Sequence, residues 1–179
     1  ITGLSAAGTY VYQWTISNAP CVASTDQMSI IVNAAPSTAA AGVDQSVCAG
    51  ITVTMAGNVP TTGSGLWTKI SGPAGGTITA PTSATSTITA LVAGTYVYQW
   101  TISNAPCTAS SDQMSIIVSG TPTTANAGVD QTICTSAGGV TMAGNTPTTG
   151  TGVWTQVSGP ASTITTASSS TTTVTGMGT

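Results

Sequence analysis

The sequence predicts an all-β protein made of tandem, immunoglobulin-like antiparallel β-sandwich repeats of about 86 residues. Three observations predict this class. The stretch GTYVYQWTISNAPC at Gly8–Cys21 recurs unchanged at Gly94–Cys107, 86 residues later. Apolar and polar residues alternate over short segments, as they do in half-buried strands. Clusters of Gly, Pro, Asn and Ser interrupt these segments about every eight to twelve residues, which is the spacing of turns in a sandwich.

The repetition extends over the whole chain. AGVDQSVC at Ala41–Cys48 returns as AGVDQTIC at Ala127–Cys134, and TMAGNVPTTGSGLWTKISGP from Thr54 returns as TMAGNTPTTGTGVWTQVSGP from Thr141. The first and last residues fall at the same phase of the repeat. We therefore expect three parts: the last two strands of one repeat (1–34), a complete repeat (35–119) and the N-terminal part of a third (120–179).

Two interpretations of the incomplete repeats remain open. The chain is either a segment of a longer tandem array, or a subunit whose end pieces complete a neighbour's half-domain by strand addition. The linkers NAAPSTAAA and SGTPTTANA are short and contain one Pro each. Such linkers favour stiff joints between repeats.

Individual strands follow from alternation with a period of two. In TYVYQWTIS, one face carries Tyr96, Tyr98, Trp100 and Ile102. The segments AGVDQSV, ITVTM, GLWTKIS, STITAL and DQMSIIV supply the other strands of the complete repeat. No segment offers about ten residues of apolar helical spacing with a cap, so we predict essentially no helix.

The composition of the chain excludes several classes of function. Charged residues make up only 3% of the chain, with four acidic residues, one Lys and a net charge of −3. Ser and Thr take about a third of the chain, which is typical of a secreted β-rich protein and compatible with O-linked glycans. Nucleic acid is excluded as an expected partner because phosphate binding needs clustered Lys or Arg. Membrane insertion is not expected either, since no apolar run approaches about 18 to 20 residues.

The motifs ANAGVDQTIC, TMAGNTPTTGTGVWTQVSGP and GTYVYQWTISNAPC together resemble the tandem PKD-type, immunoglobulin-like repeats of large secreted and cell-surface proteins of Bacteroidetes. These include gliding-motility adhesins and proteins exported through the type 9 pathway. The most specific element is Trp67 or Trp154 followed by SGP. The resemblance implies a β-sandwich, an extracellular or cell-surface location and a stalk or adhesin role.

The aromatic residues have two interpretations. Because the chain has no Phe, they are the only large side chains available to fill a core. The alternative is an exposed platform on which sugars stack. We expect the core role, and the candidate core residues are Trp14, Trp67, Trp100, Trp154, Tyr96 and Tyr98.

The few charged residues suggest no site. Asp26, Asp44, Asp112 and Asp130 recur in DQ pairs. Calcium needs six to eight oxygens with several carboxylates close together, so we expect turn or strand-edge roles and no metal site. Lys69 is Gln156 in the sister repeat, and we therefore expect a solvated side chain.

Catalysis is also not expected. General acid-base and nucleophilic chemistry need a titrating partner near neutral pH, and the chain has neither His nor Glu. The Gly-rich SGPAGG lacks the spacing and the Lys of a phosphate-binding loop. We predict no catalytic residues and no cofactor.

The four cysteines are disulfide candidates: Cys21, Cys48, Cys107 and Cys134. No C-x-x-C occurs, which disfavours a zinc site. A bridge within the repeat, Cys48 to Cys107, is the default for an autonomous domain. In an immunoglobulin-like sandwich, however, these positions lie at opposite ends, roughly 20 Å apart. A bridge across the joint, from Cys48 to the last hairpin of the next repeat, is the second hypothesis.

These observations predict a structural, non-catalytic region of an extracellular bacterial filament or adhesin stalk. Its partners would be neighbouring repeats of the same chain, or identical chains in a fibre. The alternative is an array of carbohydrate-binding modules in a secreted multidomain protein. Aromatic residues aligned on an exposed face would favour that alternative.

Overall fold

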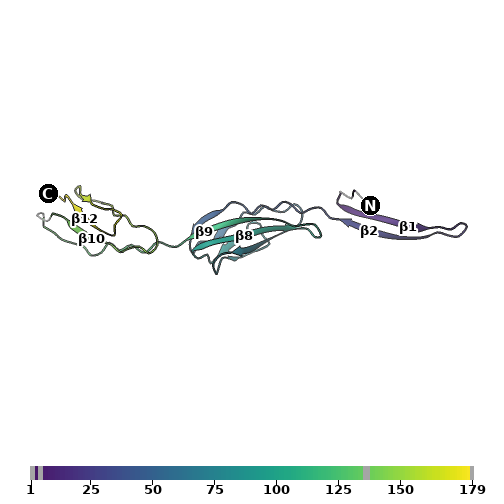
Figure 1. Ribbon diagram of the computed structural model, residues 1–179, viewed down its shortest axis with the longest axis horizontal. Helices are drawn as coiled ribbons and strands as arrows, with labels where there is room; N and C mark the ends of the chain where they lie inside the picture. Colours follow the sequence, from purple (N-terminus) through teal and green to yellow (C-terminus); the bar gives the residue numbers. More distant parts are fainter. Residues whose placement is uncertain (1–2, 4–5, 135–137, 178–179) are drawn as a thin grey trace. The chain divides into compact units, whose positions relative to one another are not determined.

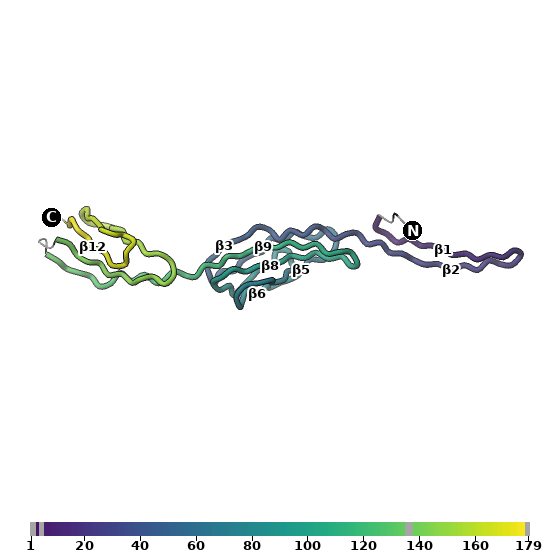
Figure 2. Tube along the Cα trace, in the orientation of Figure 1, coloured from purple at the N-terminus to yellow at the C-terminus, as the bar shows by residue number. Residues whose placement is uncertain are grey.

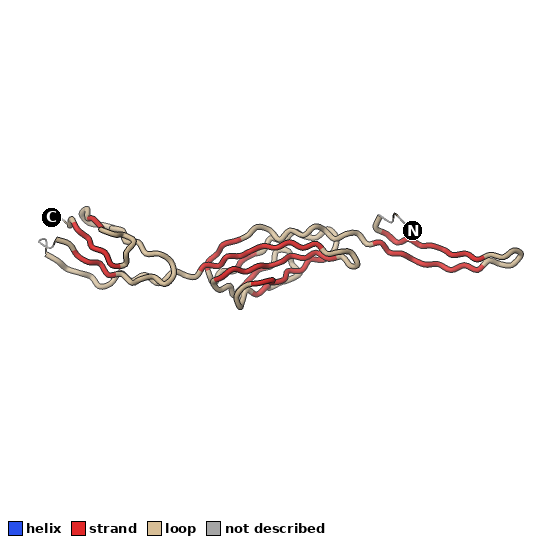
Figure 3. The backbone as a smooth tube through the Cα atoms, in the orientation of Figure 1, coloured by secondary structure: helices blue, strands red, loops and turns tan. Residues whose placement is uncertain are grey.

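The computed structural model describes residue 3 and residues 6–134 and 138–177, and the regular elements in this part of the chain are all strands (Figures 1 and 3). The all-β prediction is confirmed. The chain separates into two compact units, Ile1–Ser119 and Gly120–Thr179. The first unit holds a hairpin and a complete sandwich, and the second holds one small sheet with long irregular segments.

The complete sandwich contains a four-stranded sheet in the order β3-β9-β8-β5. In Figure 2, β3 follows the outer side of β9, and β8 lies next to β9. The strands β3 and β9 are parallel, whereas the other two pairs are antiparallel. Their bounds are β3 Gln45–Cys48, β5 Ser64–Ser71, β8 Gly94–Ser103 and β9 Ser110–Ser119.

The second sheet of the sandwich has three antiparallel strands in the order β4-β7-β6. Their bounds are β4 Val53–Thr54, β6 Thr77–Ile78 and β7 Thr87–Thr89. One core cluster includes Val53 and Ile88 from this sheet together with Trp67 and Met114 from the other. Two sheets facing each other across a shared core form the predicted immunoglobulin-like sandwich.

Period-two alternation explains the two longest strands. In β8, Tyr96, Tyr98, Trp100 and Ile102 are fully buried, while the alternate residues between them are only partly covered. In β9, Met114 and Ile116 are buried on the same face. Because successive side chains point to opposite faces of a strand, this pattern places one face of the hairpin in the core.

The N-terminal hairpin repeats the geometry of β8 and β9. It consists of β1 Gly8–Ile16 and β2 Ser24–Val32. Trp14 lies opposite Asp26, as Trp100 lies opposite Asp112. In the described residues this sheet has two strands only. The face that is buried in the complete sandwich is therefore largely open to solvent here.

The unit formed by residues 120–179 repeats the smaller sheet of the sandwich. Its strand order is β10-β12-β11, with both pairs antiparallel. The bounds are β10 Val140–Ala143, β11 Thr163–Ile164 and β12 Thr171–Thr175. Trp154 lies in an irregular segment, whereas its counterpart Trp67 lies in β5. The difference has a physical cause: β5 forms its ladder with β8, and a strand needs such a neighbour for its backbone hydrogen bonds.

Candidate functional site

Two tryptophans form the centre of the sandwich core. The ring centroids of Trp67 and Trp100 are 5.0 Å apart, with 38° between the ring planes. The Trp67 indole N–H donates to Ala84 O at 3.2 Å, and the Trp100 indole N–H donates to Asn58 O at 3.1 Å. Both rings are buried, so neither is available for stacking on a sugar.

The two tyrosines of β8 are also buried, and each hydroxyl has a backbone partner. Tyr98 donates to Gly76 O at 2.7 Å. Burial, and secondarily the neighbouring Tyr96, raises the pKa of Tyr98 to about 12. The Tyr96 hydroxyl accepts from the Val92 N–H at 3.1 Å. A Tyr near the start of this strand that bonds back to the preceding corner is a tyrosine corner, which sequence reasoning missed although the i−4 spacing was readable.

Trp14 and Trp154 differ from the expected core role. Trp14 is 72% exposed, so its assignment to a core is wrong for this structure. The reason is that no second sheet faces β1 and β2 in the described part of the chain, whereas the β4-β7-β6 sheet faces the identical sequence in β8. Trp154 is half-buried. Its indole N–H donates to Ser170 O at 3.3 Å, but one side of its ring borders a pocket.

The aspartates fasten the entering segment of the sandwich to β9. Asp112 Oδ2 accepts from the Ala41 N–H at 2.8 Å, and Asp44 Oδ1 accepts from the Ser115 N–H at 2.8 Å. These are strand-edge contacts between side chain and backbone. Among the described residues, no group of three His, Cys, Asp or Glu side chains could hold a metal ion.

The expectation that Lys69 has a solvated side chain is wrong. Its ammonium group lies 4.8 Å from the centroid of the Tyr96 ring and donates to Pro73 O and Gly75 O in the SGPAGG turn. The sister residue Gln156 donates to Pro160 O at 2.6 Å, in the equivalent turn. Either side chain fastens the turn because both present an N–H donor at the end of a long stem. The Lys-to-Gln difference had suggested that no common role existed.

All four cysteines lie in the described residues and are free thiols. Cys48 is the cross-strand partner of Ser119 at the end of β9, whereas Cys107 precedes Ser110 at its start. Ten residues of strand span about 30 Å, and a disulfide needs Cα atoms within about 7 Å. The Cys48–Cys107 bridge is therefore incompatible with this geometry. The bridge across the joint stays a prediction.

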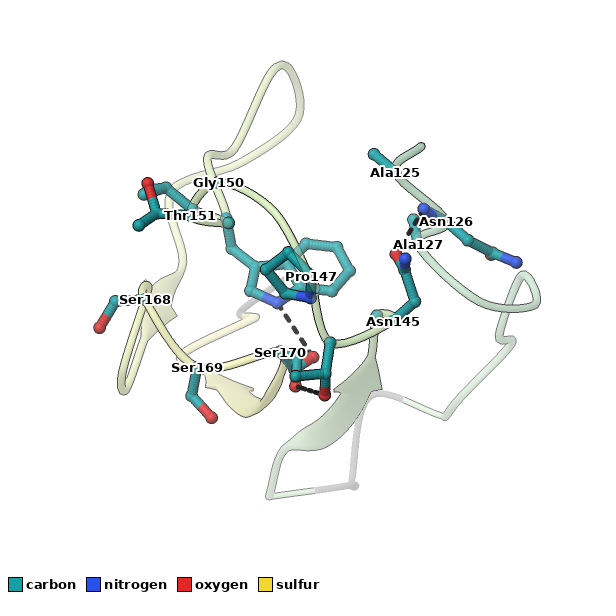
Figure 4. Close-up of a pocket in the computed structure, with 15 residues that line it drawn as sticks. Ala125, Asn126, Ala127, Asn145, Pro147, Gly150, Thr151, Ser168, Ser169 and Ser170 are labelled. Atoms are coloured by element: carbon teal, nitrogen blue, oxygen red, sulfur yellow. Dashed lines mark hydrogen bonds between the residues drawn. The ribbon is translucent and has the colours of Figure 1, made fainter. Parts of the chain in front are cut away.

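A pocket with a volume of about 530 Å³ lies beside Trp154. Figure 4 shows the side chains that line it, which come from the segments around Asn126, Asn145 and Ser169. Gly144 and Gly152 also line it. The walls are uncharged, and most groups are apolar or hydroxyl-bearing. This chemistry suits a flat apolar or aromatic group with a hydrogen-bond donor.

No helix in the described part of the chain is long and apolar enough to cross a membrane.

Comparison with known proteins supports the fold. The family model described as K319L-like, PKD domain matches residues 41–118. A comparison with curated proteins gave no significant match. The matched range covers the complete sandwich, whose PKD-type, immunoglobulin-like fold agrees with its strand order.

Proposed function

We propose that this chain is a structural, non-catalytic region of an extracellular filament or adhesin stalk, in a large surface protein of the kind that its motifs resemble. Disulfides across the joints would stiffen it. The observation that supports the proposal best is the position of the residues with binding chemistry. In the sandwich, Trp67, Trp100, Tyr98, Asp112 and Lys69 all make contacts within the repeat itself.

The repeat also has the properties of an independent building block. Fourteen buried side chains form one core cluster within residues 39–118, so a single period has its own hydrophobic interior. A repeat that buries its own core adds length without depending on distant parts of the chain. This is the requirement of a spacer or stalk.

The extracellular location is proposed from family and composition. PKD domains typically occur in extracellular proteins. Only 3% of residues are charged, and Ser and Thr supply most of the polar surface. Low charge reduces repulsion between neighbouring chains. Such surfaces suit side-by-side packing in a fibre or the attachment of O-linked glycans.

Immunogold electron microscopy of intact source cells tests this function. Antibodies raised against the purified chain should decorate fibres or a surface layer outside the envelope. Protease treatment of intact cells should remove the label. Label confined to the cell interior would refute the proposal.

The alternative, a carbohydrate-binding array, predicts a different result. The aromatic residues of the complete sandwich are buried, which disfavours a sugar platform there. A glycan array probed with the chain should therefore remain at background. Specific binding that is lost in Trp14→Ala would favour the alternative, because the Trp14 side chain is exposed.

A further inference from the structure

We propose that residues 33–41, which connect β2 to the complete sandwich, are a docked part of that sandwich, and that the turn between β8 and β9 closes the joint where they begin. We call residues 33–41 the connecting segment. A repeat would then be joined to the one before it through short-range contacts that leave little freedom to bend. This joint deepens the proposed stalk, on which its biological meaning rests.

The connecting segment contributes side chains to the core of the sandwich. Ala39 is 8% exposed and Ala41 is fully buried, and both belong to the core cluster. Thr38 and Ala40, which alternate with them, are exposed. Successive side chains of a strand point to opposite faces in this way. The segment therefore packs on the sandwich as a further strand would.

One edge of the connecting segment is bonded to β9. The Ala39 N–H donates to Ser110 Oγ at 2.9 Å, and the Ala41 N–H donates to Asp112 Oδ2 at 2.8 Å. Figure 2 shows the chain between β2 and β3 running along β9. Because Ala39 and Ala41 are buried, their N–H groups need such partners. Side chains of β9 supply them in place of a regular ladder.

The other edge is bonded to the loop of residues 56–63. Asn58 Oδ1 accepts from the Ala40 N–H at 2.8 Å, and Asn58 Nδ2 donates to Thr38 O at 2.9 Å. The Asn58 N–H also donates to Ala40 O at 3.0 Å. One asparagine thus makes three hydrogen bonds to the backbone of the connecting segment.

Ser37 fixes the same loop closer to the joint. Its Oγ accepts from the Thr61 N–H at 3.0 Å and from the Thr62 N–H at 2.9 Å. In return, the Ser37 N–H donates to Thr62 O at 3.0 Å. A hydroxyl that accepts from two consecutive amides holds the loop and the segment together through local side-chain to backbone bonds.

The hydroxyl contacts recur in the unit of residues 120–179, where Thr123 stands in the place of Ser37. Thr123 Oγ1 accepts from the Thr148 N–H at 2.9 Å and from the Thr149 N–H at 3.0 Å. The Thr123 N–H donates to Thr149 O at 3.0 Å. Two different hydroxyl side chains therefore make the same three bonds.

The asparagine contacts recur as well. Asn145, the sister of Asn58, accepts from the Asn126 N–H at 2.7 Å and donates to Thr124 O at 3.1 Å. The Asn145 N–H donates to Asn126 O at 3.0 Å. The two connections differ in sequence, NAAPSTAAA against SGTPTTANA, yet both dock on the loop of the repeat that they enter. Docking is thus a property of the repeat.

The backbone also approaches the loop closely where the chain leaves the connecting segment. Gly42 has a φ of 89°, and a Cβ at this position would lie 2.9 Å from Ala56 O. The sister Gly128 has a φ of 86°, and its Cβ would lie 2.8 Å from Ala143 O. Only glycine adopts this conformation readily and leaves room for the carbonyl.

The turn between β8 and β9 contacts the first residues of the connecting segment. Asn33 Nδ2 donates to Ala105 O at 2.6 Å, and Asn104 Nδ2 donates to Ala34 O at 2.9 Å. The Cys107 thiol lies 3.5 Å from Asn33 O and 3.4 Å from Ala34 O. Because Asn33 directly follows β2, these contacts hold the chain at the point where it leaves one repeat.

Backbone NMR relaxation of the full chain tests the docking. Order parameters at residues 37–41 should be about 0.85, the value of rigid backbone, whereas a flexible linker would fall below about 0.6. Values of a flexible linker would overturn the proposal.

A pair of variants at Ser37 tests the contacts themselves. Ser37→Ala removes the acceptor for two amides, and hydrogen exchange at the Thr62 N–H should be about 10-fold faster. Ser37→Thr is the matched control, because Thr123 makes these bonds in the sister position, and it should exchange like the wild type. Tryptophan fluorescence checks that the sandwich stays folded. Unchanged exchange in Ser37→Ala would refute the docking contacts.

Thiol labelling tests the closed joint. Iodoacetamide is added to the reduced full chain, and the rate at Cys107 is divided by the rate at the exposed Cys48. Asn33→Ala should raise this ratio about 3- to 10-fold, because the change removes a hydrogen bond across the joint. Thr108→Ala, at an exposed residue next to Cys107, should leave the ratio unchanged. An unchanged ratio in Asn33→Ala would overturn the closure of the joint.

These outcomes are separable from that of the proposed function. Surface labelling of cells can succeed while residues 37–41 behave as a flexible linker, in which case the docking fails alone. A docked segment with label confined to the cell interior would refute the extracellular role alone.

Discussion

Gly65 and Trp100 face each other across neighbouring strands so closely that a β-carbon on Gly65 would lie 2.1 Å from Cζ2 of the indole. The indole covers the backbone of β5 because this position lacks a side chain. The contact links Gly65, which stands in the turn-like stretch TTGSGLW, to one of the two tryptophans buried in the core.

Gly65→Ala should destabilise the complete sandwich by roughly 1 to 3 kcal/mol, the usual cost of overpacking. The added methyl group forces Trp100 away from Trp67. Urea unfolding followed by tryptophan fluorescence measures the loss. Gly152→Ala is the matched control and should leave the midpoint unchanged, because a β-carbon there meets nothing within 4 Å. Equal effects of the two substitutions would show that the indole contact is not responsible.

We expect the free energy of unfolding to fall at alkaline pH because of Tyr98. Its pKa is raised from 10.0 to about 12 in the folded chain, so between these values the unfolded chain has lost a proton that the folded chain keeps. Stability from this group is complete below pH 10 and declines as pH rises towards about 12. Urea midpoints measured at rising pH check this. Tyr98→Phe should make the decline shallower, whereas an unchanged slope would assign it to other groups.

The same substitution has an effect at neutral pH. Tyr98→Phe leaves Gly76 O without its donor in a buried position. The expected cost is about 1 to 3 kcal/mol, measured by urea unfolding at pH 7. Tyr12→Phe, at the sister position in the half-exposed hairpin, should cost much less. A smaller loss for Tyr98→Phe than for Tyr12→Phe would contradict the assignment.

Asp112→Ala should loosen the entering segment from β9. The Ala41 N–H is buried and loses a charged acceptor, which costs about 1.5 to 3 kcal/mol. Hydrogen exchange at Ala41 should accelerate, and the urea midpoint should fall. Asp26→Ala is the control, since Asp26 is exposed. Added Ca²⁺ should change neither value; stabilisation by Ca²⁺ would revive a metal role.

Lys69→Gln should be tolerated, because Gln156 fastens the equivalent turn with its amide. Lys69→Ala removes both hydrogen bonds from the ammonium group to the SGPAGG turn and should cost about 1 kcal/mol. Thermal unfolding of the two variants gives the comparison. If both lose the same stability, the ammonium charge over Tyr96 matters more than the turn contacts.

Most of the sandwich could be predicted from the sequence because the strands follow from local alternation of apolar and polar residues. Alternation around Trp100 and Met114 was sufficient to place β8 and β9 and their buried faces. The opening strand was less accurate: AGVDQSV forms regular strand only over Gln45–Cys48. Before that point the segment is held by Asp112 and Asp44 side chains, which a period-two pattern does not reveal. The domain boundaries remain a prediction.

The candidate site was less predictable because the burial of its side chains depends on which other elements pack against them. Trp14 and Trp100 have identical sequence surroundings, yet one is 72% exposed and the other is buried. No local pattern distinguishes them. Lys69 was misjudged for a related reason: two different side chains perform one task, and only the position of the turn carbonyls shows it.

The parallel pairing of β3 with β9 has a mechanical consequence. These strands lie near the two ends of the repeat in sequence, and they run in the same direction. Tension applied to both chain ends therefore slides one strand along the other and stretches the hydrogen bonds of the ladder together. An antiparallel pair pulled from its open end would instead unzip bond by bond at low force. The repeat is thus built to resist pulling along the direction in which its neighbours are attached.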